Sequence, residues 1–322
     1  MEKIKLAPIV LFAYQRPLHT QRTLESLYNN FLANRSILYV YVDAPKKGAT
    51  DEQIEKNKEV RRIVRSKQWC GEVHVIEQSI NQGLAASIRN GVSEIVQKYG
   101  CVIVVEDDLQ LSPAFLDYMN KALHFYESYP AVFSIGGYTY PEAKMAIPAD
   151  YSYDTYVCLR NCSWGWATWK DRWEKIDWSA TRYQTLKASK AMREAFNRMG
   201  DDEFDMFYAE QERGLNIWSI FFTMAHFEHH AVAIYPCKSY VDNIGLDGSG
   251  ENCSINPSLN HTDLSIEANP RFVDVLYEDS RIVNAFYNVN SRTSLPLWKR
   301  AVNRIWKQMR GKPLFLKKKV YE

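Results

Sequence analysis

Short apolar runs alternate with segments of helical periodicity through the first 108 residues, and this alternation limits the folds open to the chain. The four apolar runs read PIVLFAY, ILYVYVD, EVHVIEQ and CVIVVEDD. Residues 20–31 and 51–66 have helical spacing, and residues 81–100 read as a turn and a helix that Gly100 ends. Because near-continuous apolar strands are buried on both faces, the pattern predicts an α/β fold with a mostly parallel sheet flanked by helices.

Charged residues stand where three of these predicted strands end. Arg16 lies in the loop after the first strand, and Asp43 ends the second. Glu106, Asp107 and Asp108 follow the fourth strand directly. The carboxyl ends of parallel strands share one edge of the sheet, which is where such folds bind their ligands. The sequence therefore predicts a ligand site at this edge.

Three adjacent carboxylates at the end of a buried strand repel one another and are costly to desolvate. A divalent cation would offset that cost, since Mg²⁺ and Mn²⁺ prefer hard oxygen ligands and often use one or two carboxylates plus substrate phosphates. The alternative is that Asp108 or Ser112 caps the helix that begins near Pro113. One capping residue does not account for three acids, so the triplet favours a metal site.

The segment VVEDDLQLSPAFLDYM resembles the EDD-type metal motif of the N-acetylglucosaminyltransferase I family and its bacterial relatives. These are inverting, metal-dependent glycosyltransferases of the GT-A fold, a Rossmann-like, mostly parallel sheet flanked by helices. The resemblance implies Mn²⁺ or Mg²⁺ as cofactor and Asp108 as its ligand. It also implies that Glu106 and Asp107 lie nearer the sugar and the ribose of a nucleotide-sugar donor.

Further segments agree with this resemblance in their order along the chain. FAYQRP is similar to the strand and loop whose arginine contacts the nucleotide, here Arg16. YVD is similar to the segment whose acid contacts the uracil and ribose, here Asp43. The helix in NQGLAASIRNG, which includes Ser87, corresponds to the one that lines the nucleotide site.

The segment SWGWATWKDRW resembles the aromatic segment that shapes the donor-sugar and acceptor site. By that likeness Trp164, Gly165 and Trp166 bind the donor, while a tryptophan-rich corner of the core is the alternative. The segment NIGLDGSGENC resembles a closing loop of the bacterial members, but Asn252 and Cys253 stand where those often carry a histidine.

Inverting transfer needs a carboxylate that accepts the proton of the acceptor hydroxyl. Relatives carry this acid just before the last core helix, beside a tryptophan, and the aligned residue here is Asn216. The role then passes to Asp205, Glu210 or Glu212, of which Glu212 and Asp205 are our predicted catalytic residues. The alternative is that these acids solvate a helix face.

The C-terminal tail differs from the rest of the chain in charge. Residues 291–322 contain ten Lys or Arg and only one acid, Glu322. The tail places Trp298, Ile305 and Trp306 on one apolar stripe, which is typical of helices that lie on anionic membranes. We expect residues 1–290 to form the GT-A domain and 291–322 a basic amphipathic tail, for which packing against the domain is the alternative to membrane contact.

No apolar run approaches the roughly 18 residues that span a bilayer, and the N-terminus reads better as a strand than as a signal peptide. The six cysteines show no CxxC pairing and suggest free thiols in a reducing compartment. We therefore expect a cytoplasmic protein that the tail can attach to the inner face of the membrane. No recognisable motif points to nucleic acid.

The sequence as a whole predicts transfer of a sugar from a nucleotide-diphosphate donor to a glycan or lipid-linked glycan. By resemblance the donor is a UDP-sugar, with UDP-N-acetylglucosamine as the named candidate. A sugar nucleotidyltransferase is one alternative, although it would carry a glycine-rich loop after the first strand, and YQRPLHT has no glycine. A non-catalytic glycan-binding protein on the same scaffold is the other, because the aligned base is missing.

Overall fold

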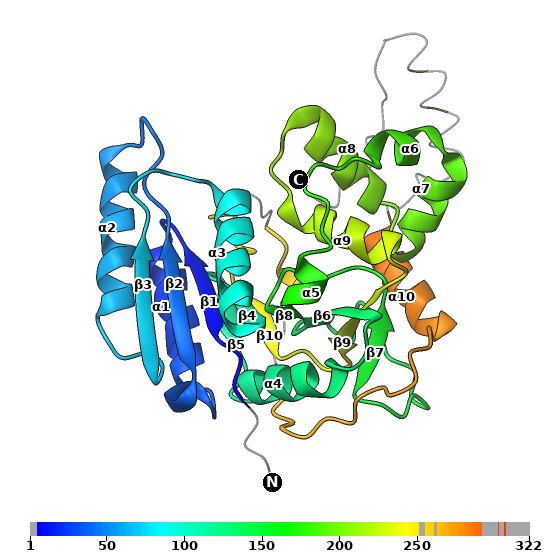
Figure 1. Cartoon of the computed structure of the whole chain (residues 1–322), viewed down its shortest axis with the longest axis horizontal. Helices are drawn as coiled ribbons and strands as arrows, with labels where there is room; N and C mark the ends of the chain where they lie inside the picture. Colours follow the sequence, from blue (N-terminus) through cyan, green and yellow to red (C-terminus); the bar gives the residue numbers. More distant parts are fainter. Residues whose placement is uncertain (1–4, 251–254, 261–262, 292–301, 303–305, 307–322) are drawn as a thin grey trace.

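The structure is a computed structural model, and it describes residues 5–250, 255–260, 263–291, 302 and 306. A sheet of eight strands forms its centre (Figure 1). From edge to edge the strands are β3 (Glu72–Glu77), β2 (Ile37–Val42), β1 (Ile9–Ala13), β4 (Cys101–Glu106), β8 (Trp166–Trp169), β6 (Val132–Gly136), β9 (Val232–Pro236) and β7 (Thr155–Cys158). A separate ribbon pairs β5 (Leu109–Leu111) with β10 (Val241–Asn243) in antiparallel fashion.

The central sheet is mainly parallel, as the sequence predicts. β3, β2, β1 and β4 pair in parallel, and so do β6 and β9. β8 and β7 run against their neighbours. The α/β class with a GT-A, Rossmann-like arrangement is therefore confirmed. The antiparallel strands come from the aromatic-rich second half, where apolar alternation is too short to read from the sequence.

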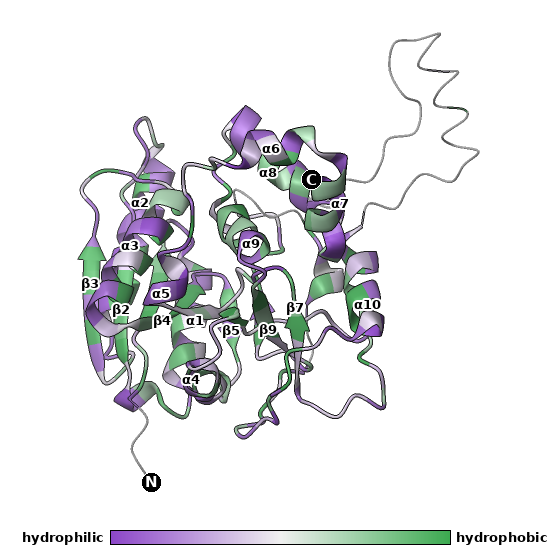
Figure 2. Ribbon diagram, turned by 45° about the vertical axis from the view of Figure 1, so that its right-hand side comes forward, coloured by the Kyte–Doolittle hydropathy of each residue, from purple (hydrophilic) through white to green (hydrophobic). Residues whose placement is uncertain are grey.

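Helices cover both faces of the sheet, and alternate residues of each strand point to opposite helical layers. The helices are α1 (Pro17–Tyr28), α2 (Asp51–Arg65), α3 (Leu84–Tyr99), α4 (Phe115–Tyr126), α5 (Lys170–Trp173), α6 (Tyr183–Ala188), α7 (Lys190–Phe196), α8 (Glu203–Arg213), α9 (Trp218–Glu228) and α10 (Ser280–Asn290), with 3-10 turns at Ala33–Arg35, Asn197–Met199 and Pro257–Leu259. Ile9 and Leu11 of β1 join the core formed with α1, α2 and α4. Val10 and Phe12 join the core formed with α3, α5 and α9. In Figure 2 hydrophobic residues run through β2, β7 and β9, and hydrophilic residues lie on α3.

Local sequence signals explain where the first helices begin and end. Thr50 and Gln53 form a capping box at the start of α2. Pro17 opens α1, where its missing N–H costs nothing, and Gly100 ends α3 in the left-handed conformation at φ 86°. α1 therefore starts and ends about three residues earlier than its apolar spacing predicts, and residues 29–36 form a loop.

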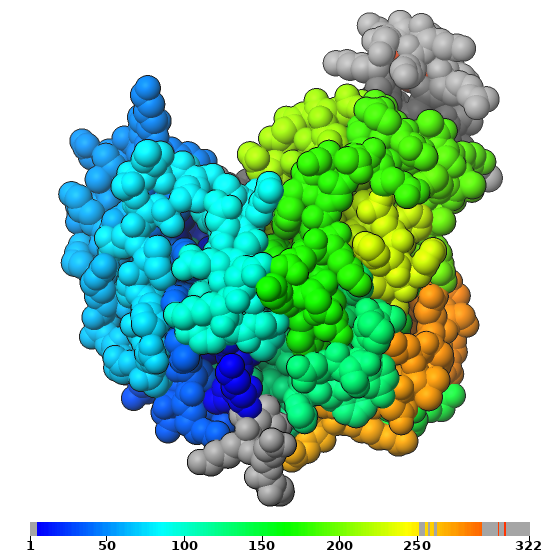
Figure 3. All heavy atoms as spheres, viewed as in Figure 1, coloured from blue at the N-terminus to red at the C-terminus, as the bar shows by residue number. Residues whose placement is uncertain are grey.

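Helices α6, α7 and α8 form a separate helical lobe, with a small core of its own that includes Leu186 and Phe207. The carboxyl ends of the parallel strands lie toward the top of Figure 1, on the side where the lobe stands. Figure 3 shows a notch there between the cyan residues of the α3 region and the green residues of the lobe. The sheet thus presents its carboxyl edge beside a hollow in the surface.

Three further expectations concern the cysteines, a membrane-spanning helix and the C-terminal tail. The cysteines at 70, 101, 158, 162 and 237 are free thiols. No helix in the described part of the chain combines the length and the apolar character needed to cross a membrane. The predicted amphipathic tail lies outside the described residues, apart from Ser291, Val302 and Trp306.

Candidate functional site

The ends of β1, β2 and β4 lie level with one another at the carboxyl edge of the sheet. Phe12 of β1 lies opposite Glu106 of β4, and Ala13 lies opposite Val42 of β2. The residues that follow each strand are therefore brought together. We call Arg16, Asp43, Glu106, Asp107 and Asp108 the carboxylate edge.

Arg16 joins two of the three acids that follow β4. Its Nη2 lies 2.5 Å from Asp107 Oδ1 and 3.0 Å from Asp108 Oδ2. The backbone N–H of Tyr14 donates to Asp107 Oδ2 at 3.3 Å, and Thr23 Oγ1 donates to the Asp107 carbonyl at 2.9 Å. Both aspartate side chains are buried, whereas the Arg16 side chain is 18% exposed. A single cationic nitrogen can thus be shared by both carboxylates.

Glu106, the last residue of β4, shows the cost of this crowding. Burial raises its pKa to about 8, and repulsion from Asp108 and Asp107 adds to the rise, while Arg16 opposes it. Burial also raises the pKa of Asp107, against the attraction of Arg16. Three acids share one arginine, so the cluster can accept more positive charge.

The chemistry of this cluster fits a divalent cation. Asp107 and Asp108 supply hard oxygen ligands, and their shared contact with one Arg16 nitrogen shows that both can face one positive charge. Within the described ranges no three His, Cys, Asp or Glu side chains are grouped so as to hold a metal ion by themselves. Two carboxylates suit a cation that completes its shell with water and substrate phosphates.

Asp43 has a buried carboxylate that is extensively hydrogen-bonded within the protein. It accepts from the backbone N–H groups of Ala44 at 2.9 Å, Gln82 at 2.9 Å and Gly83 at 2.8 Å. It also accepts from the side-chain amide of Asn81 at 3.0 Å. Asp43 therefore fixes the turn that starts α3, which is a positioning role that the sequence did not predict.

Ser87 lies in the first turn of α3, shortly after the turn that Asp43 fixes. Its backbone N–H donates to the Gly83 carbonyl at 3.0 Å. Its Oγ is buried and has no hydrogen-bond partner in the described part of the chain. Such an atom is expected to find a partner, and its position in α3 keeps Ser87 a candidate for contact with a ligand.

The β5–β10 ribbon packs against Asp108 from the other side. The backbone N–H of Ile244 donates to the Asp108 carbonyl at 2.9 Å. A Cβ at Gly245 would lie 2.3 Å from Asp108 Oδ2, so only glycine fits there. Beyond it, Asp247 Oδ2 lies 3.2 Å from His19 Nε2 of α1. Gly245 is the glycine of the NIG segment noted in the sequence. The sequence did not show that this glycine lies against Asp108.

The predicted aromatic segment divides between surface and core. Trp164 is half-buried and packs edge-on against Tyr138, with ring centroids 4.6 Å apart. Gly165 has φ 64°, and a Cβ there would lie 2.9 Å from the Val241 side chain of β10. Gly165 therefore lies against the ribbon. The half-buried Trp164 keeps exposed surface that a ligand can contact.

Trp166 differs from the other two residues of that segment. It is fully buried in β8 and stacks on Trp173 at 5.6 Å and on Trp218 at 5.1 Å between ring centroids. It has no exposed surface through which it could contact a bound sugar. The structure therefore places Trp166 in the core, the alternative that the sequence left open for the aromatic residues.

The acids predicted as bases lie on α8 of the helical lobe. Glu212 accepts hydrogen bonds from Tyr183 at 2.9 Å and from Lys187 at 2.6 Å, and the bond from Lys187 lowers its pKa. Glu210 accepts from the Ile217 backbone N–H at 2.6 Å, at the start of α9. Asp205 is half-buried in the first turn of α8. The structure gathers Arg16 and the acids of β4 at one edge, and it places these candidate bases across the notch (Figures 1 and 3).

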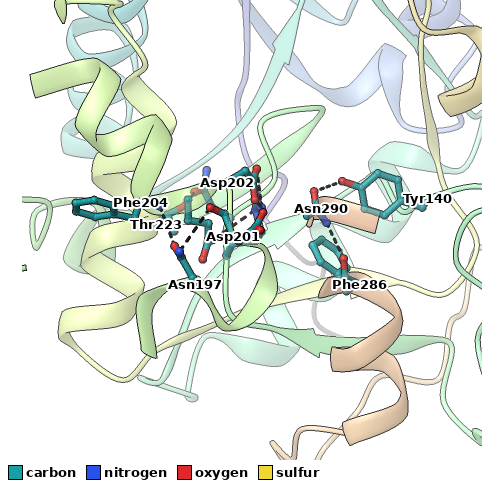
Figure 4. Close-up of polar contacts among 11 residues, drawn as sticks. Tyr140, Asn197, Asp201, Asp202, Phe204, Thr223, Phe286 and Asn290 are labelled. Carbon is teal, nitrogen blue, oxygen red and sulfur yellow. Dashed lines mark hydrogen bonds and ion pairs between the residues drawn. The ribbon is translucent and has the colours of Figure 1, made fainter. Parts of the chain in front are cut away.

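A second group of charges is buried beneath the lobe (Figure 4). Arg160 Nη1 lies 3.0 Å from Asp202 Oδ1, and Arg160 Nε lies 3.5 Å from Glu203 Oε1. Burial raises the pKa of Glu203 to about 8, while Arg160 opposes the rise. We call Arg160, Asp202 and Glu203 the Arg160 cluster. Gly200 borders it, since a Cβ there would lie 2.2 Å from Asp202 Oδ1 and 2.6 Å from Asn290.

Comparisons with known proteins give this geometry a context. The sequence matches the family described as Glycosyl transferase family 2 over residues 9–205. No curated protein sequence matches the chain.

Several solved structures are similar to the chain at low identity. They include Staphylococcus aureus TarS 1–349 (10% identity, TM-score 0.36, covering 73% of this chain and 59% of that one), mouse xyloside xylosyltransferase 1 in its apo form (12%, 0.36, 70% and 83%) and apo UDP-glucose pyrophosphorylase (11%, 0.37, 74% and 94%). The chain thus spans about three fifths of the TarS fragment's length. Likeness at this level carries no argument about substrate.

Proposed function

Because the chain belongs to glycosyl transferase family 2, we propose that it transfers a sugar from a nucleoside-diphosphate donor to a hydroxyl group of a glycan or lipid-linked glycan. The observation that carries this proposal is the carboxylate edge. Within the matched residues, Arg16, Asp107 and Asp108 meet at the strand ends where an α/β sheet binds its ligand. The narrower resemblance to the N-acetylglucosaminyltransferase I family has no support from the family match.

We propose that Asp108, with Asp107 beside it, holds a divalent cation, Mn²⁺ or Mg²⁺. When bound, the cation would neutralise charge on the departing nucleoside diphosphate. Both aspartates contact Arg16, whose guanidinium would be free to bind a phosphate oxygen if the aspartate oxygens held a cation instead. Glu106 stands next to them with a raised pKa and donates or accepts a hydrogen bond at a sugar hydroxyl.

The nucleoside and the donor sugar also have proposed partners near the carboxylate edge, and the reaction needs a base. Asp43 holds the start of α3, and Ser87 Oγ offers a hydrogen bond to the nucleoside, for which we propose uridine. Trp164 borders the donor sugar, for which N-acetylglucosamine is the first candidate. Transfer with inversion forms the bond from the acceptor oxygen to C1 as the bond to phosphate breaks, and a carboxylate takes the hydroxyl proton.

That carboxylate is one of three acids of α8, namely Asp205, Glu210 and Glu212. The bond from Lys187 lowers the pKa of Glu212, which makes it a weaker base than an ordinary glutamate. Each acid should be replaced by its amide. Loss of the base lowers kcat by about 10²–10⁴-fold and leaves nucleotide affinity unchanged. If none of the three amides does so, the base is none of these three acids.

The experiment that tests the function is a donor screen. The purified chain is incubated with Mn²⁺, a panel of UDP-, GDP- and dTDP-sugars, and soluble or lipid-linked glycan acceptors, and nucleoside diphosphate release is measured. We expect metal-dependent release with one donor class and none with EDTA. Absence of turnover with every donor, together with retained glycan binding, would instead show a binding protein on this scaffold.

A further inference from the structure

A second cavity lies at the opposite end of the sheet from the carboxylate edge. It is bordered by the loop that leads into β2 and by the loop that leads into β3, and it encloses about 410 Å³. These loops precede their strands, so the cavity is at the amino-terminal edge. A volume of this size is within the range of small-molecule sites. We call it the Tyr28–Trp69 cavity.

The walls of this cavity are held together by backbone contacts. The Gly71 N–H donates to the Ala33 carbonyl at 2.9 Å, and the Glu72 N–H donates to the Ser36 carbonyl at 3.2 Å. A Cβ at Gly71 would lie 2.6 Å from the Asn34 carbonyl oxygen, so the two loops approach as closely as glycine allows. The cavity is therefore formed by the fold and needs no ligand to shape it.

Aromatic side chains provide the apolar part of the lining. Phe31 is 58% exposed and Tyr28 is 45% exposed, which is unusual for residues that bury well. Trp69 is buried below them, and its indole N–H donates to the Ile63 carbonyl at 3.3 Å. The Lys67 ammonium lies 3.1 Å from the centroid of the Tyr28 ring and holds that ring in place.

Amide side chains provide the polar part, and one of them is available. Asn30 uses its amide inside the protein, donating to Ser26 and accepting from the Leu116 N–H. The exposed side-chain amide of Asn34, by contrast, makes no hydrogen bond to any residue that the structure describes. Gln68 donates to the Cys70 and Gly71 carbonyls, which leaves its own oxygen as an acceptor at the rim.

The composition of the lining selects among ligand classes. None of the side chains that line the cavity is charged, and the ammonium beside them, that of Lys67, is held on the Tyr28 ring, so the lining itself offers no charged partner to a phosphate or a carboxylate. An acyl chain would leave the amides of Asn34 and Gln68 without partners. A neutral sugar satisfies both parts, because its C–H face packs on an aromatic ring while its hydroxyl groups bond to amides.

We propose that the Tyr28–Trp69 cavity binds a neutral sugar unit of the glycan, at a site remote from the transfer reaction. This rests on the proposed function, which makes a glycan the acceptor. The cavity and the carboxylate edge lie at opposite ends of the same parallel strands, so one long chain can reach both. Occupation of the cavity would hold the enzyme on its polymer between transfers by raising the effective concentration of the acceptor end.

The test measures sugar binding directly. Saturation-transfer NMR is recorded with the full chain and four neutral trisaccharides: chitotriose, cellotriose, maltotriose and xylotriose. We expect transfer to at least one, with Phe31→Ala weakening its Kd about tenfold. Asn34→Ala should weaken it about threefold to fivefold. Tyr277→Ala, which removes an aromatic ring that is 41% exposed elsewhere on the surface, should leave the Kd unchanged.

Two further results separate this inference from the proposed function. Asp108→Asn should keep the trisaccharide signal while it abolishes nucleotide-sugar turnover. If the unaltered chain binds a trisaccharide through Phe31 but turns over no nucleotide-sugar donor, the transfer function is wrong and the cavity is still a sugar site. If no trisaccharide binds, or if binding is the same in Phe31→Ala as in the unaltered chain, the inference is wrong. Thermal melts of both variants check that the fold is intact.

Discussion

Arg16 and Arg160 each pair with two buried carboxylates, and the surroundings of the two groups are different. At the carboxylate edge the Arg16 side chain is 18% exposed, and its acids stand in loops directly after strands. In the Arg160 cluster the arginine is 11% exposed and its acids are 4% and 2% exposed, beneath the helical lobe. The pairing chemistry is the same, but only the first group can exchange its partner for a ligand.

This contrast separates function from stability. A buried ion pair gains little over an apolar pair of the same shape, yet losing one partner is costly, because it leaves an uncompensated charge. A charge group at an open edge avoids much of that cost, because water or a ligand can replace the lost partner. Substitutions should therefore impair reaction at the carboxylate edge and folding at the Arg160 cluster.

The largest effect is expected for Asp108→Asn. Transfer should fall by about a thousandfold or more, because the variant loses the charge that attracts the cation. The free energy of unfolding should change by less than about 1 kcal/mol or rise, since one of three crowded acids is neutralised. Diphosphate release and urea unfolding measure the two effects. Asp263→Asn, an exposed acid paired with Lys238, is the control, and transfer within tenfold of wild type in Asp108→Asn would remove the metal proposal.

Arg160→Met should produce the opposite pattern. It leaves two acids buried without their cation, so the free energy of unfolding should fall by about 3–5 kcal/mol. The triple variant that also carries Asp202→Asn and Glu203→Gln should recover part of that loss. Arg16→Met is the matched variant at the open edge, and there nucleotide affinity should fall more than stability does. Equal destabilisation by both arginine substitutions would mean that the two groups do not differ in kind.

The carboxylate edge could be predicted from sequence because each of its residues ends a strand or comes within three residues after one. Once the strands are known to be parallel, residues 16, 43 and 106–108 must lie at one edge. What could not be predicted was how Asp43 uses its carboxylate. Its partners at residues 81–83 belong to a turn whose conformation depends on α3 packing against the sheet.

The Arg160 cluster had no sequence signal. Arg160 and Asp202 are 42 positions apart, with β8, loops and short helices between them, and their pairing depends on how the lobe docks. The position of Trp166 was ambiguous for a similar reason, because a tryptophan beside a glycine fits both a sugar site and a core. The β5–β10 ribbon escaped prediction since each strand is only three residues long. These features are set by tertiary packing, which local periodicity does not encode.

Gly245→Ala tests the close contact at the carboxylate edge. The added Cβ would lie 2.3 Å from Asp108 Oδ2, so either the ribbon or the carboxylate must shift. We expect the affinity for nucleotide in the presence of Mn²⁺ to fall about tenfold, with a stability loss of about 1–2 kcal/mol. Gly214→Ala is the matched control, because φ 65° strains it by about 1–2 kcal/mol while nothing lies within 4 Å. Calorimetric titration should show unchanged affinity in that control, and an unchanged value in Gly245→Ala would contradict the contact.

The smallest effect is a pH dependence that belongs to the Arg160 cluster. Burial raises the pKa of Glu203 from 4.5 to about 8. Below about pH 4.5 the carboxyl group is protonated in both states. As the pH rises toward 8 the unfolded chain releases a proton that the folded chain retains, so the free energy of unfolding falls. Glu203→Gln removes this contribution. The free energy of unfolding of the variant, relative to that of wild type, should therefore be about 1–2 kcal/mol higher at pH 8 than at pH 5.5.

Urea unfolding of wild type and Glu203→Gln at pH 5.5, 7 and 8 measures this difference in slope. Glu194→Gln is the control, because its side chain is 68% exposed on α7 and it should follow the wild-type slope. Parallel slopes for wild type and Glu203→Gln would show that Arg160 keeps the carboxylate ionised when buried. The Arg160 cluster would then be fully ionised, and its lack of access to ligand would still distinguish it from the carboxylate edge.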